Sequence, residues 1–197
     1  MTTLYLVRHG QTDWNLQGIY QGHSDIPLND TGKQQAQESV KNQNGLVYDA
    51  IYASDLIRAQ QTAGYFAQKS GLPIHTDARL REIYMGKWEG MRFNEIRQQY
   101  PDLVAAREKR PTINGAPGGE TVRDLACRII EATDEICEAH PDGKVLIVAH
   151  GLSMSTLYCL ANHIDLDKAF EYIPQNAEVR QVEWIPGKVK IDCVEQN

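Results

Sequence analysis

Short apolar runs alternate along the chain with longer segments in which apolar positions recur at helical spacing. Residues 3–7 and residues 144–149 are such runs, and both are typical of buried parallel strands. Residues 49–53 and residues 73–76 are two further strand candidates.

Three longer segments predict helices. A polar helix is expected from an N-cap within Asn29-Asp30-Thr31 to about residue 43, and another over residues 56–69 after an N-cap within Ser54-Asp55. Residues 121–139 carry one apolar stripe and form the longest predicted helix. Because strands alternate with helices over the whole chain, the pattern favours an α/β fold in which helices cover both faces of one sheet.

The end of the chain has a different pattern, in which apolar and polar residues alternate. Residues 178–185 and residues 188–194 flank a Pro186-Gly187 turn, so we expect an antiparallel hairpin there. The outer edge of such a hairpin could pair with a second copy of the chain or face solvent. The sequence therefore predicts a monomer or a homodimer and does not decide between them.

One stretch fits neither pattern. Residues 84–118 are irregular apart from a short helix expected at residues 92–100, and residues 112–119 are expected to form a loop. An irregular insertion in an α/β protein tends to lie over the binding site. We therefore expect residues 1–197 to form a single domain in which residues 84–118 cover the substrate.

Composition and charge narrow the class of protein. The chain has 197 residues, of which 42% are hydrophobic and 23% charged, enough for one globular core without metal or disulfide support. Its 20 basic and 26 acidic residues give a net charge of −6, which argues against nucleic acid and anionic membranes as partners. No apolar stretch approaches the roughly 20 residues of a membrane span. An anionic ligand must therefore be held by a local group of cations.

The four cysteines show no metal-binding or redox spacing. Cys127 and Cys137 lie on one predicted helix about 15 Å apart, too far to bridge. No CxxC spacing involves these two or the others, Cys159 and Cys193. We therefore expect four reduced thiols in a cytoplasmic protein.

Two histidines occupy equivalent places in the pattern. His9 and His150 each follow an apolar strand, and each is followed by a glycine, Gly10 or Gly151. Ligands bind at the carboxyl ends of strands in an open α/β sheet. A single histidine there could be a packed core residue, a metal ligand, a base or a nucleophile. A glycine after each lets the backbone turn and leaves the ring uncovered, so the pair favours a chemical role.

Neighbouring residues favour a phosphoryl group over a metal ion as the ligand. The sequence has no HxH or HExxH spacing, and Arg8 beside His9 would repel a divalent cation. An arginine fork matches two phosphoryl oxygens and keeps its charge near neutral pH. Arg58 lies near the start of a predicted helix and is a second candidate, although its spacing fits a surface arginine as well.

Five motifs together resemble the histidine phosphatase superfamily, also called the phosphoglycerate mutase-like family. The resemblance extends over residues 3–163, and five motifs in order are far more specific than an RHG triplet alone. It implies a three-layer α/β/α sandwich with a mostly parallel central sheet. The motifs are LVRHGQTDWN (6–15), YQGHSDIPL (20–28), SDLIRAQQTA (54–63), LREIYMGKWEG (80–90) and AHG (149–151).

The resemblance also implies roles for individual residues. His9 would be the nucleophile that forms a phosphohistidine, and Glu82 would be the proton donor. The phosphoryl oxygens would be bound by Arg8, Arg58 and His150. Five further positions match residues that line the substrate pocket or contact substrate through their backbone: Asn15, Gln21, Gly22, Gly151 and Leu152.

The chemistry agrees with these roles. A nucleophilic His9 must present an unprotonated nitrogen, and neighbouring arginines disfavour its protonated form while they bind phosphate. His150 is expected to act in its protonated form. Glu82 must hold a proton for the leaving alkoxide, and as a carboxylate it can then activate the water that attacks phosphohistidine.

The expected function is hydrolysis of small phosphorylated metabolites by a metal-independent, cofactor-free phosphomonoesterase. The GKWEG form of residues 86–90 is more similar to small bacterial phosphatases of broad specificity than to mutases, which are usually longer. Four alternatives stay open: a phosphoglycerate mutase that depends on bisphosphoglycerate, a dedicated alpha-ribazole phosphatase, a metal-dependent hydrolase and a non-catalytic binding module.

Overall fold

The computed structural model describes residues 1–43 and 45–193. The strands are β1 (Thr2–Arg8), β2 (Ala50–Ala53), β3 (Ile74–Thr76), β4 (Lys144–Ala149) and β5 (Val179–Trp184). The α-helices are α1 (Asp13–Gln17), α2 (Asp30–Asn42), α3 (Ile57–Ser70), α4 (Phe93–Gln99), α5 (Pro101–Lys109), α6 (Val122–Ala139) and α7 (Gly151–Ala161). Short 3₁₀ helices are η1 (Ala78–Leu80), η2 (Gly86–Trp88) and η3 (Leu166–Tyr172).

The strands form one sheet in the order β3-β2-β4-β1-β5. The neighbours from β3 to β1 are parallel, and β5 at one edge runs antiparallel to β1. The predicted mostly parallel sheet is therefore confirmed. β4 is the central strand. In its pairing with β1, Thr3 lies opposite Lys144 at one end and Arg8 lies opposite Ala149 at the other.

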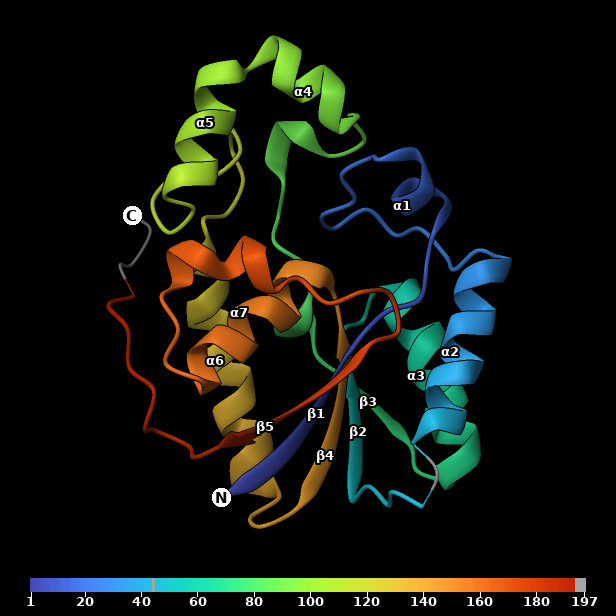
Figure 1. The fold of residues 1–197 in the computed structure, drawn as a ribbon. Coiled ribbons are helices and arrows are strands. Elements are labelled where there is room, and N and C mark those ends of the chain that lie inside the picture. The colour runs from blue at the N-terminus through green and yellow to red at the C-terminus, as the bar shows by residue number, and fades with distance from the viewer. Residues whose placement is uncertain (44, 194–197) are drawn as a thin grey trace.

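Successive residues of the central strands belong to different cores on the two faces of the sheet. Leu6 of β1 and Ile147 of β4 pack in a core with the buried sides of α6 and α7. Val7 and Val148, the next residues along, pack in a second core with residues of α2 and α3. Figure 1 shows α2 and α3 beside one face and α6 and α7 beside the other. The predicted three-layer α/β/α sandwich is confirmed.

Local capping bonds fix the starts of two predicted helices. Asn29 Oδ1 accepts the N–H of Gly32 at 2.9 Å in the first turn of α2. Thr121 Oγ1 accepts the N–H of Asp124 at 3.2 Å in the first turn of α6. Both helices lie where the sequence pattern predicts them. No helix within the described ranges is long and apolar enough to cross a membrane.

The expected N-cap of α3 is wrong. The helix begins at Ile57, and Ser54 Oγ accepts the N–H of Leu56 at 3.3 Å instead of a helical N–H. The Ile57 N–H donates to Asp25 Oδ1 at 2.6 Å, across a long separation in sequence. The start of α3 is therefore tied to the loop before α2, which a local pattern cannot predict.

The predicted C-terminal hairpin is also wrong. β5 forms and pairs with β1, but residues 188–193 are irregular, and Val194 lies outside the described residues. Asp134 on α6 accepts hydrogen bonds from Trp184 Nε1 (2.6 Å) and from the N–H of Gly187 (3.0 Å). These bonds turn the chain toward α6, so the segment after Pro186 leaves the sheet, as Figure 1 shows.

The expectation of four reduced thiols is corrected by a disulfide between Cys127 and Cys193. Their Cα atoms lie 5.8 Å apart, because the C-terminal segment crosses over α6. Cys137 and Cys159 are free and buried, and burial raises the pKa of the Cys137 thiol to about 12. The spacing argument against a bridge between Cys127 and Cys137 holds, but it could not reveal a partner brought in by the tertiary fold.

The segment 84–118 is more regular than its sequence suggests. The predicted short helix is α4, and residues 112–119 form the expected loop. A second helix, α5, follows α4 directly and was not predicted. Figure 1 shows both helices beyond the carboxyl ends of β1 and β4.

We predict that loss of the disulfide destabilises the fold. The bridge closes a loop across 66 residues of sequence, and Cys193→Ser should lower the free energy of unfolding by about 2–4 kcal/mol. Urea unfolding with and without reductant measures this effect. Reductant should lower the midpoint of the wild type and leave that of the variant unchanged. A wild-type midpoint that does not respond to reductant contradicts the prediction.

Candidate active site

The pairing of β1 with β4 brings the two predicted histidines together. Arg8 lies opposite Ala149 in the ladder, so the next residue of each strand, His9 or His150, stands at the same edge of the sheet. The His9 N–H donates to the Ala149 carbonyl at 2.9 Å, and the two imidazole centres are 5.2 Å apart. Residues far apart in sequence thus form one site.

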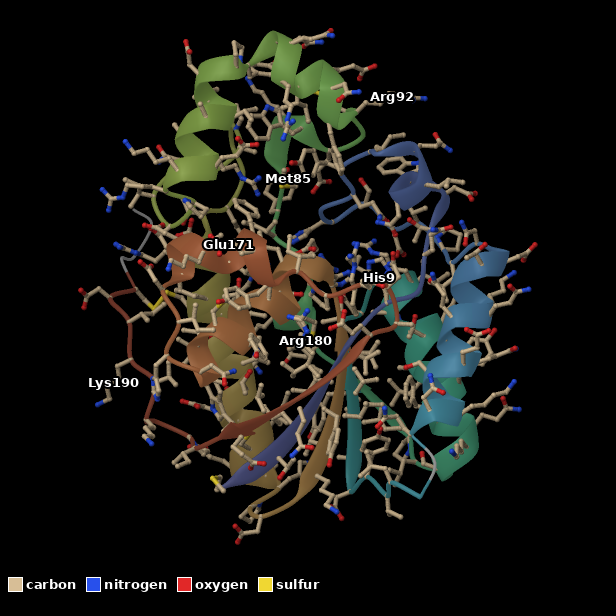
Figure 2. All side chains as sticks on the ribbon, viewed as in Figure 1. His9, Met85, Arg92, Glu171, Arg180 and Lys190 are labelled. Carbon is tan, nitrogen blue, oxygen red and sulfur yellow. A yellow bond between two sulfur atoms is a disulfide. The ribbon has the colours of Figure 1, made fainter. Side chains whose placement is uncertain are left out.

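A cavity of about 250 Å³ opens at this edge of the sheet. Figure 2 shows His9 at the upper end of the sheet and Met85 above it. Nine of the ten predicted site residues line the cavity: Arg8, His9, Asn15, Gln21, Gly22, Arg58, Glu82, Gly151 and Leu152. The tenth, His150, is fully buried beside His9. Other lining residues are Ile19, Tyr20, Ile83, Met85, Phe93, Arg107, Phe170 and Ile173.

His9 is buried and held in one tautomer. Its Nδ1 lies 2.7 Å from the Gly10 carbonyl oxygen, which can only accept, so Nδ1 carries the proton. Nε2 of the neutral ring therefore keeps its lone pair. Burial, with added repulsion from Arg58 and Arg8, holds the pKa of His9 well below its usual range. His9 is thus in the form that a nucleophile needs.

His150 has the opposite tautomer. Its Nδ1 accepts a hydrogen bond from Arg58 Nε at 3.1 Å, so the proton of the neutral ring is on Nε2. Nε2 is buried and has no hydrogen-bond partner among the described residues. Burial, followed by repulsion from Arg58, holds the pKa of His150 well below its usual range. The free protein therefore offers a neutral N–H donor at His150, and a protonated His150 in the reaction stays a prediction.

Arg58 anchors the loop that closes one side of the cavity. Only 1% of this residue is exposed, and burial lowers the pKa of its guanidinium to about 10. Nη1 donates to the Ser24 carbonyl at 2.6 Å and Nη2 to the Gly22 carbonyl at 2.8 Å. Gly22 has φ +48°, and a Cβ there would lie 1.9 Å from Glu89 Oε1. Glycine is therefore required where Arg58 holds the loop.

Arg8 is the second cation in the cavity wall. Its Nη1 donates to the Pro174 carbonyl at 2.7 Å, while its buried Nε has no partner within the described ranges. Burial lowers the pKa of Arg8, although Glu82 and Glu178 oppose this effect. A Cβ on Gly151 would lie 3.2 Å from Ile173 Cγ2 and 3.5 Å from Arg8 Nε, so a side chain there would crowd Ile173 rather than the guanidinium.

The expected reason for the two glycines needs correction. Neither Gly10 nor Gly151 has a positive φ, so neither serves a left-handed turn. A Cβ on Gly10 would lie 2.3 Å from the Gly32 carbonyl oxygen at the start of α2. Gly10 is therefore needed for close packing against α2, whereas a Cβ on Gly151 would lie 3.2 Å from Ile173 Cγ2, a tight contact with a side chain only.

Glu82 lies at the N-terminus of α7. Its Oε2 accepts the N–H of Leu152 at 3.0 Å, and its Oε1 accepts those of Ser153 at 3.1 Å and Ile83 at 2.9 Å. The first N–H groups of a helix favour a negative charge. The Glu82 carboxylate is therefore fixed beside His150, which precedes α7.

Two residues that the sequence analysis did not select hold the backbone of Glu82. Arg128 on α6 donates from Nη2 to the Glu82 carbonyl at 2.8 Å and from Nη1 to the Arg81 carbonyl at 2.8 Å. His23 Nε2 donates to the same Glu82 carbonyl at 2.9 Å. Arg128 occupies a polar position of an amphipathic helix, where an arginine is ordinary, so the sequence around it does not indicate this contact. His23 lies in a quoted motif and could have been selected.

The remaining predicted residues contribute amide groups to the cavity. Asn15 Oδ1 accepts bonds from the Thr12 N–H at 3.0 Å and from Thr12 Oγ1 at 3.1 Å, which caps α1. Gln21 is buried, and its Oε1 has no partner among the residues described. Gln21 therefore holds an unsatisfied acceptor in the cavity wall.

Comparison with known proteins decides the family. The sequence profile of the histidine phosphatase superfamily (branch 1) matches residues 4–197. The chain belongs to the histidine phosphatase superfamily. No group of three or more His, Cys, Asp or Glu side chains in the described part of this histidine phosphatase could hold a metal ion.

Known relatives of this histidine phosphatase include both phosphatases and mutases by name. It is 40% identical to "Uncharacterized phosphatase PhoE" of Bacillus subtilis (strain 168), over 80% of this chain and 76% of that one. It is 36% identical to "Probable phosphoglycerate mutase GpmB" of Salmonella choleraesuis (strain SC-B67), over 80% and 73%. The solved structure of Bacillus stearothermophilus YhfR superimposes with a TM-score of 0.86 at 35% identity, over 99% and 96%.

The lowered pKa values of His9 and His150 predict that this histidine phosphatase loses folding stability at acid pH. As the pH falls below 6.5, His9 and His150 each bind a proton in the unfolded chain before they do so in the folded chain. Each histidine therefore adds stability above pH 6.5 that is lost as the pH falls through its lowered folded-state pKa. The free energy of unfolding should fall by at most about 1.4 kcal/mol per pH unit for each histidine.

Urea unfolding at several pH values measures this slope. Replacement of one histidine, as in His150→Asn, should roughly halve the part of the slope that the two residues cause. Replacement of the exposed His163 is the matched control and should leave the slope unchanged. A wild type equally stable at pH 6.5 and one unit lower contradicts the neutral assignment.

Proposed function

We propose that this histidine phosphatase hydrolyses small phosphomonoesters through a phosphohistidine formed on His9 Nε2. The observation that carries the proposal is the tautomer of His9, because the Gly10 carbonyl fixes the proton on Nδ1. Nε2 then keeps its lone pair in a cavity that Arg8 and Arg58 also line. The phosphatase names of relatives fit this activity.

In the first step, His9 Nε2 attacks the phosphorus of the bound ester while the bond to the leaving oxygen breaks. Arg8 Nε and His150 Nε2 are buried donors without partners in the described chain, so they are available to the phosphoryl oxygens. The negative charge of the bound ester disfavours a second charge on Glu82, so Glu82 begins this step protonated and gives its proton to the leaving oxygen, which departs as an alcohol.

In the second step, water attacks the phosphorus of the phosphohistidine and the bond to His9 Nε2 breaks. Glu82, now a carboxylate, takes a proton from the water, and inorganic phosphate leaves. The N–H groups of Leu152 and Ser153 hold the carboxylate in place between the two steps. The same residue thus serves as acid and then as base.

The other cavity residues are proposed to position the substrate. Asn15 and Gln21 offer amide groups, Gly22 and Gly151 line the cavity with their backbone, and Leu152 contributes its N–H to the Glu82 site. We also propose that the segment 84–118 covers the bound substrate, since Met85, Phe93 and Arg107 come from it.

We further propose that the reaction needs no metal ion or other cofactor, because two guanidinium groups and a neutral imidazole supply the donors that a phosphoryl group requires. The substrate is proposed to be a small phosphorylated metabolite, since the cavity is small. A cytoplasmic location and a monomeric or dimeric state stay predictions from the sequence.

A phosphoglycerate mutase is the second candidate, and the 36% identity to GpmB is the observation that favours it. The chemistry at His9 is common to both activities, which differ in what attacks the phosphohistidine. In a mutase a hydroxyl of bound phosphoglycerate attacks, so turnover depends on bisphosphoglycerate and releases little phosphate. In a phosphatase, including a dedicated alpha-ribazole phosphatase, water attacks and every turnover releases phosphate.

The proton-donor role of Glu82 predicts a dependence on the leaving group. Glu82→Gln should lower kcat/KM for propyl phosphate by about a hundredfold or more, because an alkoxide must be protonated to leave. The first turnover of p-nitrophenyl phosphate should be far less affected, because nitrophenolate leaves without a proton. Rapid mixing with free alcohol, nitrophenol and phosphate as readouts measures both steps.

Glu138→Gln is the matched control for this test, since Glu138 is an exposed glutamate of α6 outside the cavity. It should behave as the wild type with both esters. Equal losses for the two esters in the first turnover of Glu82→Gln would remove the donor role and point to general damage to the site.

A further inference from the structure

Arg128 is a poorly exposed cation of α6 that no step of the proposed reaction uses. Its side chain is 17% exposed, and it is not among the described residues that line the cavity. A guanidinium has five N–H groups, and Arg128 makes five hydrogen bonds of 2.7–2.8 Å to described residues. All of its donors are therefore used inside the protein, and none is left for a ligand.

Three of these bonds hold the segment that carries the proposed proton donor. Nη1 donates to the carbonyl oxygens of Arg79 (2.7 Å) and Arg81 (2.8 Å), and Nη2 donates to that of Glu82 (2.8 Å). Residues 82–85 belong to no helix or strand, so no regular ladder of backbone bonds fixes their path. The position of the Glu82 backbone therefore depends on bonds from outside the segment.

Glu120 accepts the other two bonds from Arg128. Its Oε1 lies 2.8 Å from Nε and its Oε2 lies 2.7 Å from Nη2, which makes a two-pronged ion pair. Oε2 also accepts the N–H of Tyr84 at 2.8 Å, and the Glu120 N–H donates to the Tyr84 carbonyl at 2.9 Å. Burial opposes the charge of Glu120, but the bonds from Arg128 hold the pKa of Glu120 below its ordinary value. Glu120 is thus a carboxylate that fixes the Arg128 fork and binds the chain two residues after Glu82.

The loop before Glu120 packs too closely against the same segment to allow a side chain at Gly119. A Cβ on Gly119 would lie 2.5 Å from the Tyr84 carbonyl oxygen. The Lys87 N–H donates to the Pro117 carbonyl at 3.0 Å in the same contact. Glu120 therefore extends from a backbone that is itself held against the donor segment.

Glu82 is held at both ends, and the two sets of bonds respond differently to its proton. Its carboxylate accepts the N–H groups of Leu152 and Ser153, while its carbonyl accepts Arg128. Hydrogen bonds to a charged carboxylate are stronger than those to a neutral carboxyl group. When Glu82 takes up a proton, the bonds at its side chain weaken and those at its carbonyl stay. The contact with Arg128 therefore matters most while Glu82 is the acid.

We propose that Arg128, held by Glu120, is a positioning residue for proton transfer from Glu82 to the leaving oxygen. This inference rests on the proposed function, because it needs Glu82 to be the donor. The phosphoryl group is bound by other side chains, at Arg8, Arg58 and His150. Loss of Arg128 should therefore slow the departure of an alkoxide and leave the binding of the ester intact.

Two esters with different leaving groups test the proposal in Arg128→Met. The maximal first-turnover rate of propanol release from propyl phosphate should fall by about ten- to a hundredfold, because a misplaced donor no longer reaches the leaving oxygen. The ester concentration that gives half of this rate should change by less than about twofold, since ground-state binding is kept. Release of nitrophenol from p-nitrophenyl phosphate in the first turnover should change by less than about threefold, because it needs no proton. Rapid mixing with free alcohol and nitrophenol as readouts measures these rates.

Arg128→Lys separates position from charge. Lysine keeps the positive charge but has three donors on a flexible stem in place of a planar fork of five. It should therefore restore only part of the rate of propanol release. Full restoration would mean that charge alone matters, and it would overturn the positioning role. Glu120→Gln removes the ion pair and leaves Arg128 in place, so it should give a smaller loss that is again confined to propyl phosphate.

Arg123→Met is the matched control, since Arg123 lies on the same helix and makes no hydrogen bond with residues 79–84 in the described chain. It should behave as the wild type with both esters. Equal losses for the two esters in Arg128→Met, or an unchanged rate of propanol release, overturn the proposal.

Glu82→Gln, measured beside these variants, separates this inference from the proposed function. If Glu82→Gln shows the dependence on the leaving group and Arg128→Met does not, the positioning role alone is overturned. If Glu82→Gln loses activity equally with both esters, Glu82 is not the donor and the inference fails with that step of the proposed function. If circular dichroism shows that Arg128→Met does not fold, Arg128→Lys and Glu120→Gln decide by the same comparison.

Discussion

The Arg58 guanidinium makes the contacts on which the arrangement of the site depends. It donates Nε–H to His150 Nδ1 and its other two nitrogens to the carbonyl oxygens of Gly22 and Ser24. Because a guanidinium can only donate, it fixes His150 in the tautomer whose Nε2 carries the proton. Its charge also disfavours protonation of His9 and His150. One buried side chain therefore sets a tautomer and the position of a loop, and it adds to the effect of burial on the charge of two histidines.

A net charge of −6 is compatible with an anion site because the cations that matter are withdrawn from solvent. Arg58 and Arg107 are buried, Arg8 is partly buried, and all three line one cavity. In such a poorly solvated place each charge acts on a ligand more strongly than an exposed charge would. The overall charge disfavours binding to a polyanion such as nucleic acid, whereas the buried arginines attract a single small phosphate ester into the cavity.

Local patterns predicted the parts of the structure that depend on local interactions. The strands β1 and β4 and the helix α6 carry clear periodicity, and the register of the two strands then brings the predicted histidines together. The ten residues selected from motifs all meet at one edge of the sheet.

Features that depend on contacts distant in sequence were missed. The path of residues 188–193 and the bridge to Cys127 follow from bonds to Asp134, which no C-terminal pattern encodes. The segment of α5 has no clear apolar side, and most of its residues are exposed, so neither the helix nor the burial of Arg107 could be predicted. The tautomer of His150 depends on where Arg58 Nε points, which is a property of the folded site.

The central claim is that phosphate passes through His9 Nε2, and trapping that intermediate tests it most directly. Wild-type protein is mixed briefly with a radiolabelled phosphate ester in the presence of a chelator, quenched in base, in which phosphohistidine survives, and digested for peptide mapping. The account predicts label on the peptide that contains His9, and none in His9→Ala. A wild type that turns over without carrying label, or that carries it on another residue, would contradict the account.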